Sequence, residues 1–258
     1  NQINLSHCTA LVISEEVARE GLGNIINTTS NNIEIRPTCN ILVCQDKAKS
    51  FLETASKVED ISSKFYTSFI ESIKITSYTT PCTLSHFYSS THHDISSPLA
   101  LYCFEKDDNI ETLGLAIFDK YKMIGRTSGV ETVCYNLLTN NFEESTIEVY
   151  NYQRPDISLS INLSSPQKTK IKVTLDNGKP KITCNISVNS KILSANENYD
   201  FSTEEARQKI EAEINKFLED SCSAFLYKTS QEYGTDVIGF EGYFNKIFLT
   251  QDQINQYN

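Results

Sequence analysis

The stretch STEEARQKIEAEINKFLEDSCSAFLYKTS, residues 202–230, decides how the fold is interpreted. Its apolar side chains recur every three or four residues, the spacing of one face of an α-helix. The opening STEE, residues 202–205, fits a capping box, so we predict a long helix over about 203–230. The apolar face comprises Ala206, Ile210, Ile214, Phe217, Leu218, Cys222 and Phe225. Such a face is typical of a helix that packs on a sheet.

The segment before this helix, residues 144–188, alternates apolar and polar side chains with period two. This pattern predicts antiparallel strands with one face in water. Asp176-Asn177-Gly178 is a strong hairpin signal, because a tight turn of this type needs positive φ angles. The C-terminal part is therefore predicted to be an antiparallel sheet covered by the long helix.

The N-terminal part alternates apolar runs with helical stripes. Strands are expected at 7–13 and 38–44, an extended segment at 33–36, and helices from Ser14 to about Asn27, over 47–56 and over 59–75. Residues 76–98 look polar and irregular, 99–104 form a strand, 113–118 and 123–125 form a hairpin, and 129–138 form a short helix.

The predicted fold class is α+β in two parts, with a boundary near residue 110. Residues 1–110 form a mixed sheet covered by helices, and residues 111–258 form an antiparallel sheet packed with the long helix. We expect the N-terminal region to be incomplete, because no initiator Met or secretion signal opens the chain.

The charge balance argues against a nucleic-acid partner. The chain carries 23 basic and 33 acidic residues, a net charge of −10, whereas nucleic-acid binding needs a basic stripe. No apolar run approaches the ~20 residues of a spanning helix. The eight cysteines are scattered singly without zinc-finger spacing, so we predict free, mostly buried thiols.

No catalytic motif of known spacing appears. His92-His93-Asp94 has metal-ligand residue types but needs a further ligand, and Cys82 with His86 lacks any supporting signature for a nucleophile pair. Gly21-Leu22-Gly23 fits a helix terminus better than a phosphate cradle. We therefore predict neither a metal, a cofactor nor a catalytic residue.

Two charged groups have structural interpretations. Arg36 is expected to pair with a nearby glutamate among residues 15–34 and to fix the first helix against its loop. Asp236 follows Gly234, which fits a left-handed position after the long helix, and is expected to accept hydrogen bonds from the amides of its own turn.

Four blocks, in order, resemble the Ger(x)C proteins, the lipoprotein C subunits of spore-germination nutrient receptors. The first is LVISEEVAREGL at 11–22, and the second is EIRP at 34–37 with KAKSFL at 47–52. The third joins LGLAIF at 113–118 to KMIG at 122–125 and Glu131-Thr132, and the fourth is QEYGTDVIGF at 231–240. The chain departs from the family in its lack of Trp and of a lipobox cysteine.

The resemblance implies a non-enzymatic interaction subunit that acts with A and B membrane subunits in nutrient-triggered germination. It implies a location at the outer face of the spore inner membrane, through a lipid anchor on a cysteine upstream of this chain. The germinant is left open. The candidate structural or interaction residues that match the family blocks are Glu15, Glu16, Arg19, Gly21, Glu34, Arg36, Gly114, Gly125, Glu131, Asp236 and Gly239.

Two alternatives remain open from the residues alone. A solute-binding lipoprotein that itself captures a small germinant would need a cleft between the two parts with convergent polar groups. A hydrolase would need a pair of Cys and His, or two carboxyl groups, in contact within a pocket.

Overall fold

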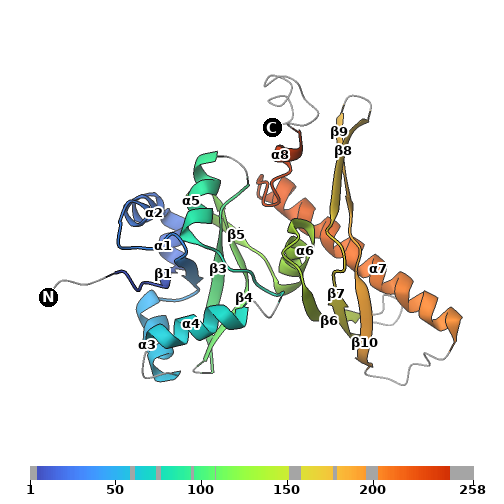
Figure 1. The fold of residues 1–258 in the computed structure, drawn as a ribbon, viewed down its shortest axis with the longest axis horizontal. Coiled ribbons are helices and arrows are strands. Elements are labelled where there is room, and N and C mark those ends of the chain that lie inside the picture. The colour runs from blue at the N-terminus through green and yellow to red at the C-terminus, as the bar shows by residue number, and fades with distance from the viewer. Residues whose placement is uncertain are drawn as a thin grey trace.

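The computed structural model describes residues 5–58, 62–73, 77–93, 96–107, 109–150, 158–176, 179–195 and 203–244. Its first unit is a five-stranded sheet with the strand order β1-β2-β3-β4-β5 (Figure 1). The strands are β1 (Ala10–Ser14), β2 (Asn40–Cys44), β3 (Leu99–Lys106), β4 (Asn109–Asp119) and β5 (Lys122–Arg126). Neighbours β1, β2 and β3 pair in parallel, and β3, β4 and β5 pair antiparallel. The predicted mixed sheet is thus confirmed.

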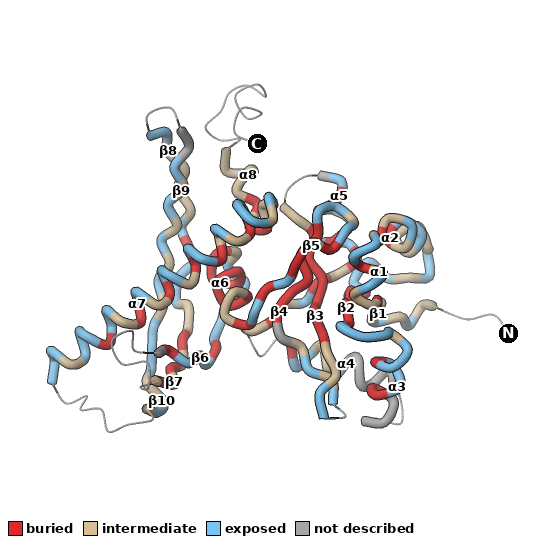
Figure 2. The backbone as a smooth tube through the Cα atoms, turned by 180° about the vertical axis from the view of Figure 1, so that it is seen from behind, coloured by how far each residue is buried: buried red, intermediate tan, exposed pale blue. Residues whose placement is uncertain are grey.

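Helices cover both faces of this sheet. One face packs against α1 (Glu15–Glu20), α2 (Gly23–Ser30) and α5 (Leu84–His93), and its core contains Tyr102 and Phe118. The other face packs against α3 (Ala48–Val58) and α4 (Ser62–Ile73). Figure 2 shows long buried stretches in β3 and β4, and every residue of β2 is buried. Burial on both faces explains why β2 is apolar at almost every position.

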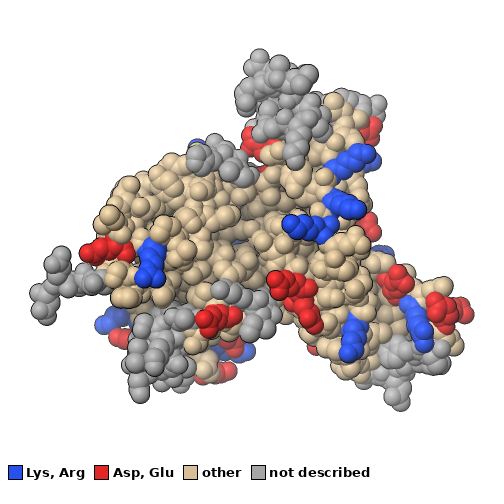
Figure 3. All heavy atoms as spheres, viewed as in Figure 1, with Lys and Arg blue, Asp and Glu red and all other residues tan. Residues whose placement is uncertain are grey.

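The second unit contains two separate antiparallel sheets. Strands β6 (Glu144–Tyr150), β7 (Ser158–Ser164) and β10 (Asn189–Ala195) form one sheet in the order β10-β7-β6. Strands β8 (Lys170–Asp176) and β9 (Lys179–Asn185) form a projecting ribbon, on which Lys170, Lys172 and Lys181 are exposed. Lys and Arg side chains gather along this ribbon in Figure 3, although the whole chain is acidic.

The helices α6 (Gly129–Thr139) and α7 (Glu204–Tyr227) join the two units. Ile210 and Ile214 of α7 pack on the β10-β7-β6 sheet, whereas Cys222 and Phe225 pack into the core under the five-stranded sheet. Figure 1 shows α6 between the two units and α7 running along the second. A π-helical segment (Lys228–Glu232) and the short α8 (Glu241–Phe244) follow α7. The long helix, and the packing of its apolar face, are confirmed.

Residue 110, where the predicted boundary falls, lies at the beginning of β4, next to the turn from β3. The five-stranded sheet therefore draws strands from both sides of residue 110. The division into 1–110 and 111–258 stays a prediction.

Several local predictions were wrong for physical reasons. The first helix does not continue to Asn27: α1 ends at Gly21, whose φ of +131° lies outside the helical region, and α2 then starts at Gly23. Residues 33–36 form turns instead of an extended segment. The side-chain oxygen of Asn32 accepts a hydrogen bond from the amide of Glu34, and its backbone carbonyl accepts one from the amide of Ile35.

The segment 76–98, predicted to be irregular, contains α5. Its two apolar anchors, Leu84 and Phe87, are buried against the sheet, so tertiary packing makes this polar stretch helical. The single predicted C-terminal sheet divides in two, and the strand β10 was missed. The long helix is capped by Thr203, whose hydroxyl accepts the amide of Ala206. The predicted capping box is therefore wrong, because the third helical position, which needs Glu or Gln in such a box, is Ala206.

The predicted hairpin is confirmed in its register. Asp176 pairs with Lys179, so two residues connect β8 and β9, as a tight turn requires. Asn177 and Gly178 themselves lie outside the described residues.

Candidate functional site

The third and fourth family blocks meet where β5 passes the end of α7. A Cβ atom added to Gly125 would lie 2.4 Å from Cζ of Tyr233. The Tyr233 ring therefore packs directly on the backbone of β5, and any side chain at position 125 would displace it. This contact ties the first unit to the segment after the long helix.

A half-buried ion pair between Lys228 and Glu131 reinforces the contact between β5 and the segment after α7. Lys228 Nζ lies 2.9 Å from Oε2 and 3.0 Å from Oε1 of Glu131, and it donates to the carbonyl of Arg126 at 3.0 Å. Glu131 also accepts the amide of Ser128 at 2.6 Å and so completes the capping box that starts α6. One carboxylate thus fixes a helix start and holds the end of α7.

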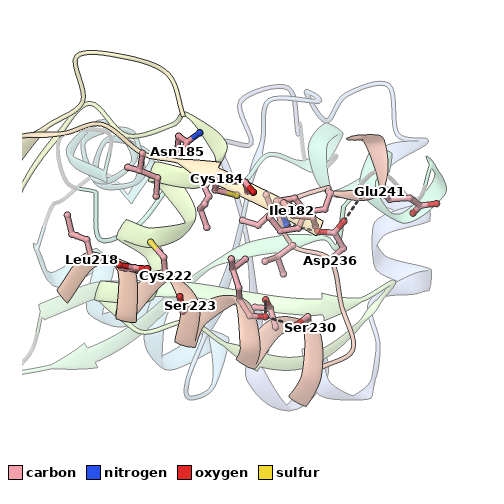
Figure 4. Close-up of a pocket in the computed structure, with 18 of the residues that line it drawn as sticks. Ile182, Cys184, Asn185, Leu218, Cys222, Ser223, Ser230, Asp236 and Glu241 are labelled. Atoms are coloured by element: carbon pink, nitrogen blue, oxygen red, sulfur yellow. Dashed lines mark hydrogen bonds between the residues drawn. The ribbon is translucent and has the colours of Figure 1, made fainter. Parts of the chain in front are cut away.

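Asp236 organises the turn after α7, as predicted. Its Oδ1 accepts the amides of Ile238 at 3.2 Å and Gly239 at 2.8 Å. Its Oδ2 accepts the amide of Glu241 at 3.0 Å (Figure 4). Burial raises the pKa of Asp236, although these backbone amides oppose the rise. Its carbonyl accepts the amide of Ser97, which anchors the turn to the segment before β3.

Gly114 and Gly234 occupy backbone conformations that favour glycine. Gly114 has a φ of +100°, and a Cβ there would lie 2.2 Å from the carbonyl oxygen of Thr127. This close approach lets the Thr127 hydroxyl accept the amide of Leu115 at 2.7 Å. Gly234 has a φ of +63°, which confirms its predicted left-handed position.

The first family block forms a second polar cluster on the opposite face of the sheet. Glu15 accepts Nε of Arg19 at 2.7 Å and the phenol of Tyr102 at 2.5 Å. Burial opposes ionisation of Glu15, but these hydrogen bonds and the charges of Arg19 and Arg126 outweigh it and lower its pKa. The pKa of Tyr102 is raised by its own burial and by the carboxylate beside it.

Arg126 connects the two clusters. Its guanidinium lies 4.6 Å from the centre of the Tyr102 ring, while its carbonyl accepts Lys228. The first and third blocks and the end of α7, far apart in the chain, are thereby linked through one residue of β5. Sequence reasoning missed Tyr102, Arg126 and Lys228; Tyr233 stood within a quoted block, but nothing in its spacing indicated a contact with Gly125.

The remaining candidates lie outside this network. Gly21 ends α1, which confirms a helix terminus at this position. Glu16, Glu34 and Arg36 are exposed. The expected ion pair of Arg36 was wrong among the described residues: its guanidinium pairs with none of Glu15, Glu16, Glu20 and Glu34, and Glu15 instead bonds Arg19 and Tyr102.

A groove of about 1090 Å³ runs beside this junction, between α7 and β9. Leu218 and Cys222 on α7 face Ile182 and Cys184 on β9 across it, as Figure 4 shows. Its described lining is half apolar, and the charged side chains within that lining are Glu219, Asp236 and Glu241.

Two family models together match almost the whole chain. "Spore germination protein N-terminal domain" matches residues 1–103, and "Spore germination B3/GerAC like, C-terminal" matches residues 113–258. The chain belongs to the spore-germination GerAC family. The resemblance seen in the four sequence blocks is confirmed.

Two relatives of this GerAC-family chain are similar along most of its length. It is 23% identical over 243 residues to "Spore germination protein GerQC" of Bacillus cereus, covering 92% of this chain and 66% of the relative. It is 23% identical over 251 residues to "Putative spore germination protein YfkR" of Bacillus subtilis (strain 168), covering 93% of this chain and 62% of the relative. The chain therefore spans a little under two thirds of these relatives.

A solved structure shares the fold. The structure titled "Crystal Structure of the GerBC protein" matches with a TM-score of 0.71 and 18% identity, over 97% of this chain and 72% of that one. This chain and the protein of that crystal structure therefore share one fold.

Among the residues weighed for catalysis in this GerAC-family chain, the Cys82 thiol donates to the carbonyl of Thr80 at 3.4 Å. Burial raises the pKa of Cys82 to about 12, so this thiol is protonated at neutral pH beside His86. Within the described part of the chain, no three His, Cys, Asp or Glu side chains could hold a metal. Asp94 lies outside the described residues, and His92 instead stacks on Tyr88 with ring centres 4.0 Å apart.

The eight thiols of the GerAC-family chain are free, as predicted. Six are buried, while Cys8 and Cys184 are half-buried. None of the described helices is long and apolar enough to cross a membrane.

Proposed function

We propose that this chain acts in spore germination as the C-type subunit of a nutrient germinant receptor. The observation that carries the proposal is the pair of spore-germination family models, which match residues 1–103 and 113–258 in order. The relatives named as spore germination proteins and the shared fold of the GerBC structure support it.

The role we propose is interaction, not catalysis. In this role the full-length protein is held at the outer face of the spore inner membrane by a lipid on an upstream cysteine. It contacts the A and B membrane subunits there. Burial raises the pKa of Cys82 to about 12, which makes this thiol a poor nucleophile and argues against the Cys82–His86 form of the hydrolase alternative.

The network through Arg126 gives the role a physical basis. The ion pair of Lys228 with Glu131 and the packing of Tyr233 on Gly125 hold the segment after α7 against the first unit. We propose that the candidate residues of the family blocks serve mainly to keep this arrangement.

The test is co-purification from spores. The full-length, lipid-anchored protein would carry an affinity tag, and the solubilised inner membrane would be analysed by mass spectrometry. We expect a permease-like subunit and a second membrane subunit to copurify, and spores lacking the gene to lose a nutrient response. A matched strain with the anchoring cysteine replaced controls for membrane placement. The proposal would be refuted if the protein were isolated without membrane subunits and if spores lacking its gene kept all their nutrient responses.

A further inference from the structure

Two cysteine thiols lie side by side where strands β1 and β2 begin. The Sγ atoms of Cys8 and Cys39 are 3.8 Å apart, although the two residues are 31 positions apart in the chain. Cys8 lies just before β1 and Cys39 directly before β2. The amide of Asn40 donates to the carbonyl of Thr9 at 3.0 Å, so the parallel pairing of the two strands brings the thiols together.

The distance between the two sulfur atoms can close without a change in the strands. A disulfide bond is about 2.05 Å long, so the atoms must approach each other by roughly 1.8 Å. Neither cysteine belongs to a regular strand, and each thiol makes only a weak contact with a carbonyl, at 3.4 Å to Ala10 and at 3.8 Å to Asn40. Rotation of both side chains can therefore supply the approach.

A small cavity of about 240 Å³ gives a reagent access to the pair. Its lining includes both thiols together with His7, Arg36 and Glu71. Cys8 is half-buried, whereas Cys39 is only 2% exposed, and burial raises the pKa of Cys39 to about 12. Cys8 is therefore the thiol that a reagent meets first, and Cys39 can react only with a sulfur already held beside it.

The other six thiols lack this combination of a close partner and an opening beside it. Five of them are buried, namely Cys44, Cys82, Cys103, Cys134 and Cys222. Cys184 is half-buried like Cys8, but it lies on β9 in the second unit. It provides a matched control for the reactivity of an accessible thiol.

We propose that Cys8 and Cys39 are a disulfide site, at which a reversible bond fastens the edge strand β1 to β2. The oxidant is a low-molecular-weight disulfide, RSSR. Cys8 loses its proton and attacks one sulfur of RSSR; the S–S bond breaks, and RSH leaves with a proton. Cys39 then loses its proton and attacks the Cys8 sulfur, and a second RSH leaves. The two cysteines give up two electrons and two protons, and RSSR is reduced to two RSH.

The bond would act where the first unit has least support. In the order β1-β2-β3-β4-β5, β1 is an edge strand, and such strands open more readily than central ones. A covalent link there restricts the unfolded chain and keeps β1 paired. The location proposed above, outside the membrane, is one in which disulfides persist. The reaction itself is tested on the purified chain and does not depend on the receptor-subunit role.

Peptide mass spectrometry provides the test, after treatment of the chain of 258 residues with oxidised glutathione and blocking of the remaining thiols. Trypsin cuts at Arg19, so the two cysteines fall in separate peptides, 1–19 and 20–47. We expect these peptides to be joined, at a mass two hydrogen atoms below their sum, with the link at Cys39. A glutathione that stays on Cys8, a link to a different cysteine, or no reaction would each overturn the proposal.

Melting temperature then shows whether the bond suits the native fold. Oxidation should raise it by about 5 °C, and dithiothreitol should reverse the rise. Cys8→Ser, at a half-buried position outside the core, should abolish both the link and the rise, as should Cys39→Ser. The control Cys184→Ser should keep both. An unchanged or lower melting temperature in the fully linked protein would refute the inferred fastening of β1.

Discussion

Replacement of Gly125 by alanine tests the junction between the two units directly. The new Cβ would lie 2.4 Å from Cζ and 2.6 Å from Oη of Tyr233, far inside van der Waals contact. Because Tyr233 is a half-buried side chain, its ring can move away, and the packing of the segment after α7 on β5 is then lost. We expect the variant to fold and to be less stable.

The magnitude follows from two opposing effects. Overpacking of this kind costs about 1–3 kcal/mol. Gly→Ala at a position without positive φ recovers about 0.4–1 kcal/mol, because it restricts the unfolded chain. The net loss for Gly125→Ala should be about 1–2 kcal/mol. Once Tyr233→Ala removes the ring, only the favourable effect remains, so the same substitution should stabilise the protein by about 0.5 kcal/mol.

A double-mutant cycle by urea denaturation measures both values. The expected coupling between positions 125 and 233 is about 2 kcal/mol, with a change of sign between the two backgrounds. Gly242→Ala serves as the control, since a Cβ there meets no atom within 4 Å. An equal loss in the presence and absence of Tyr233, or no loss at all, would refute the packing described for this junction.

Four further outcomes follow. Lys228→Met should cost about 1–2 kcal/mol, since its partner Glu131 is only 22% exposed, whereas Lys49→Met, from a pair 85% and 64% exposed, should cost under about 0.5 kcal/mol in the same urea assay. Gly114→Ala should lower the free energy of unfolding by about 3 kcal/mol or more, because the new Cβ would clash with the backbone carbonyl of Thr127; an unchanged urea midpoint would contradict this. The lowered pKa of Glu15 stabilises the fold fully above the ordinary glutamate pKa of about 4.3, and this stabilisation is lost as the pH falls from there through the lowered pKa; Glu15→Gln should therefore flatten the loss of stability below about pH 5. Iodoacetamide at neutral pH should modify half-buried Cys8 before Cys82, whose pKa is about 12, as peptide mass spectrometry would show.

The polar clusters around Glu15 and around Glu131 both contain residues of the family blocks, and both lie next to β5. Glu15 and Glu131 lie far apart in sequence, yet both depend on Arg126: its guanidinium charge acts on Glu15, and its carbonyl accepts the Lys228 ammonium that pairs with Glu131. A change at Arg126 is therefore expected to disturb both clusters at once. Surface positions such as Glu16 and Glu34 take no part in this network and remain candidates for contact with another protein.

Local patterns predicted most elements correctly. The long helix followed from the recurrence of Ile210, Ile214 and Leu218, and the β8–β9 hairpin followed from Asp176-Asn177-Gly178. Helix α5 was missed because Leu84 and Phe87 are too few to form an apolar stripe, and only the sheet beneath them makes the segment helical. The break at Gly21 was underestimated because Val17 and Ile25 keep helical spacing across it.

At the candidate site, too, the sequence determined some features and the tertiary structure determined others. The sequence by itself determined the fold class, the family, and the residues Gly125, Glu131 and Asp236 as positions of interest. Only the tertiary structure decided that Tyr233 covers Gly125, that Lys228 meets Glu131, and that Arg126 lies over the Tyr102 ring. Periodicity and turn signals act over a few residues, so they report which face of an element is buried. They cannot report which distant face covers it, because that choice depends on how helices and sheets from the whole chain pack together.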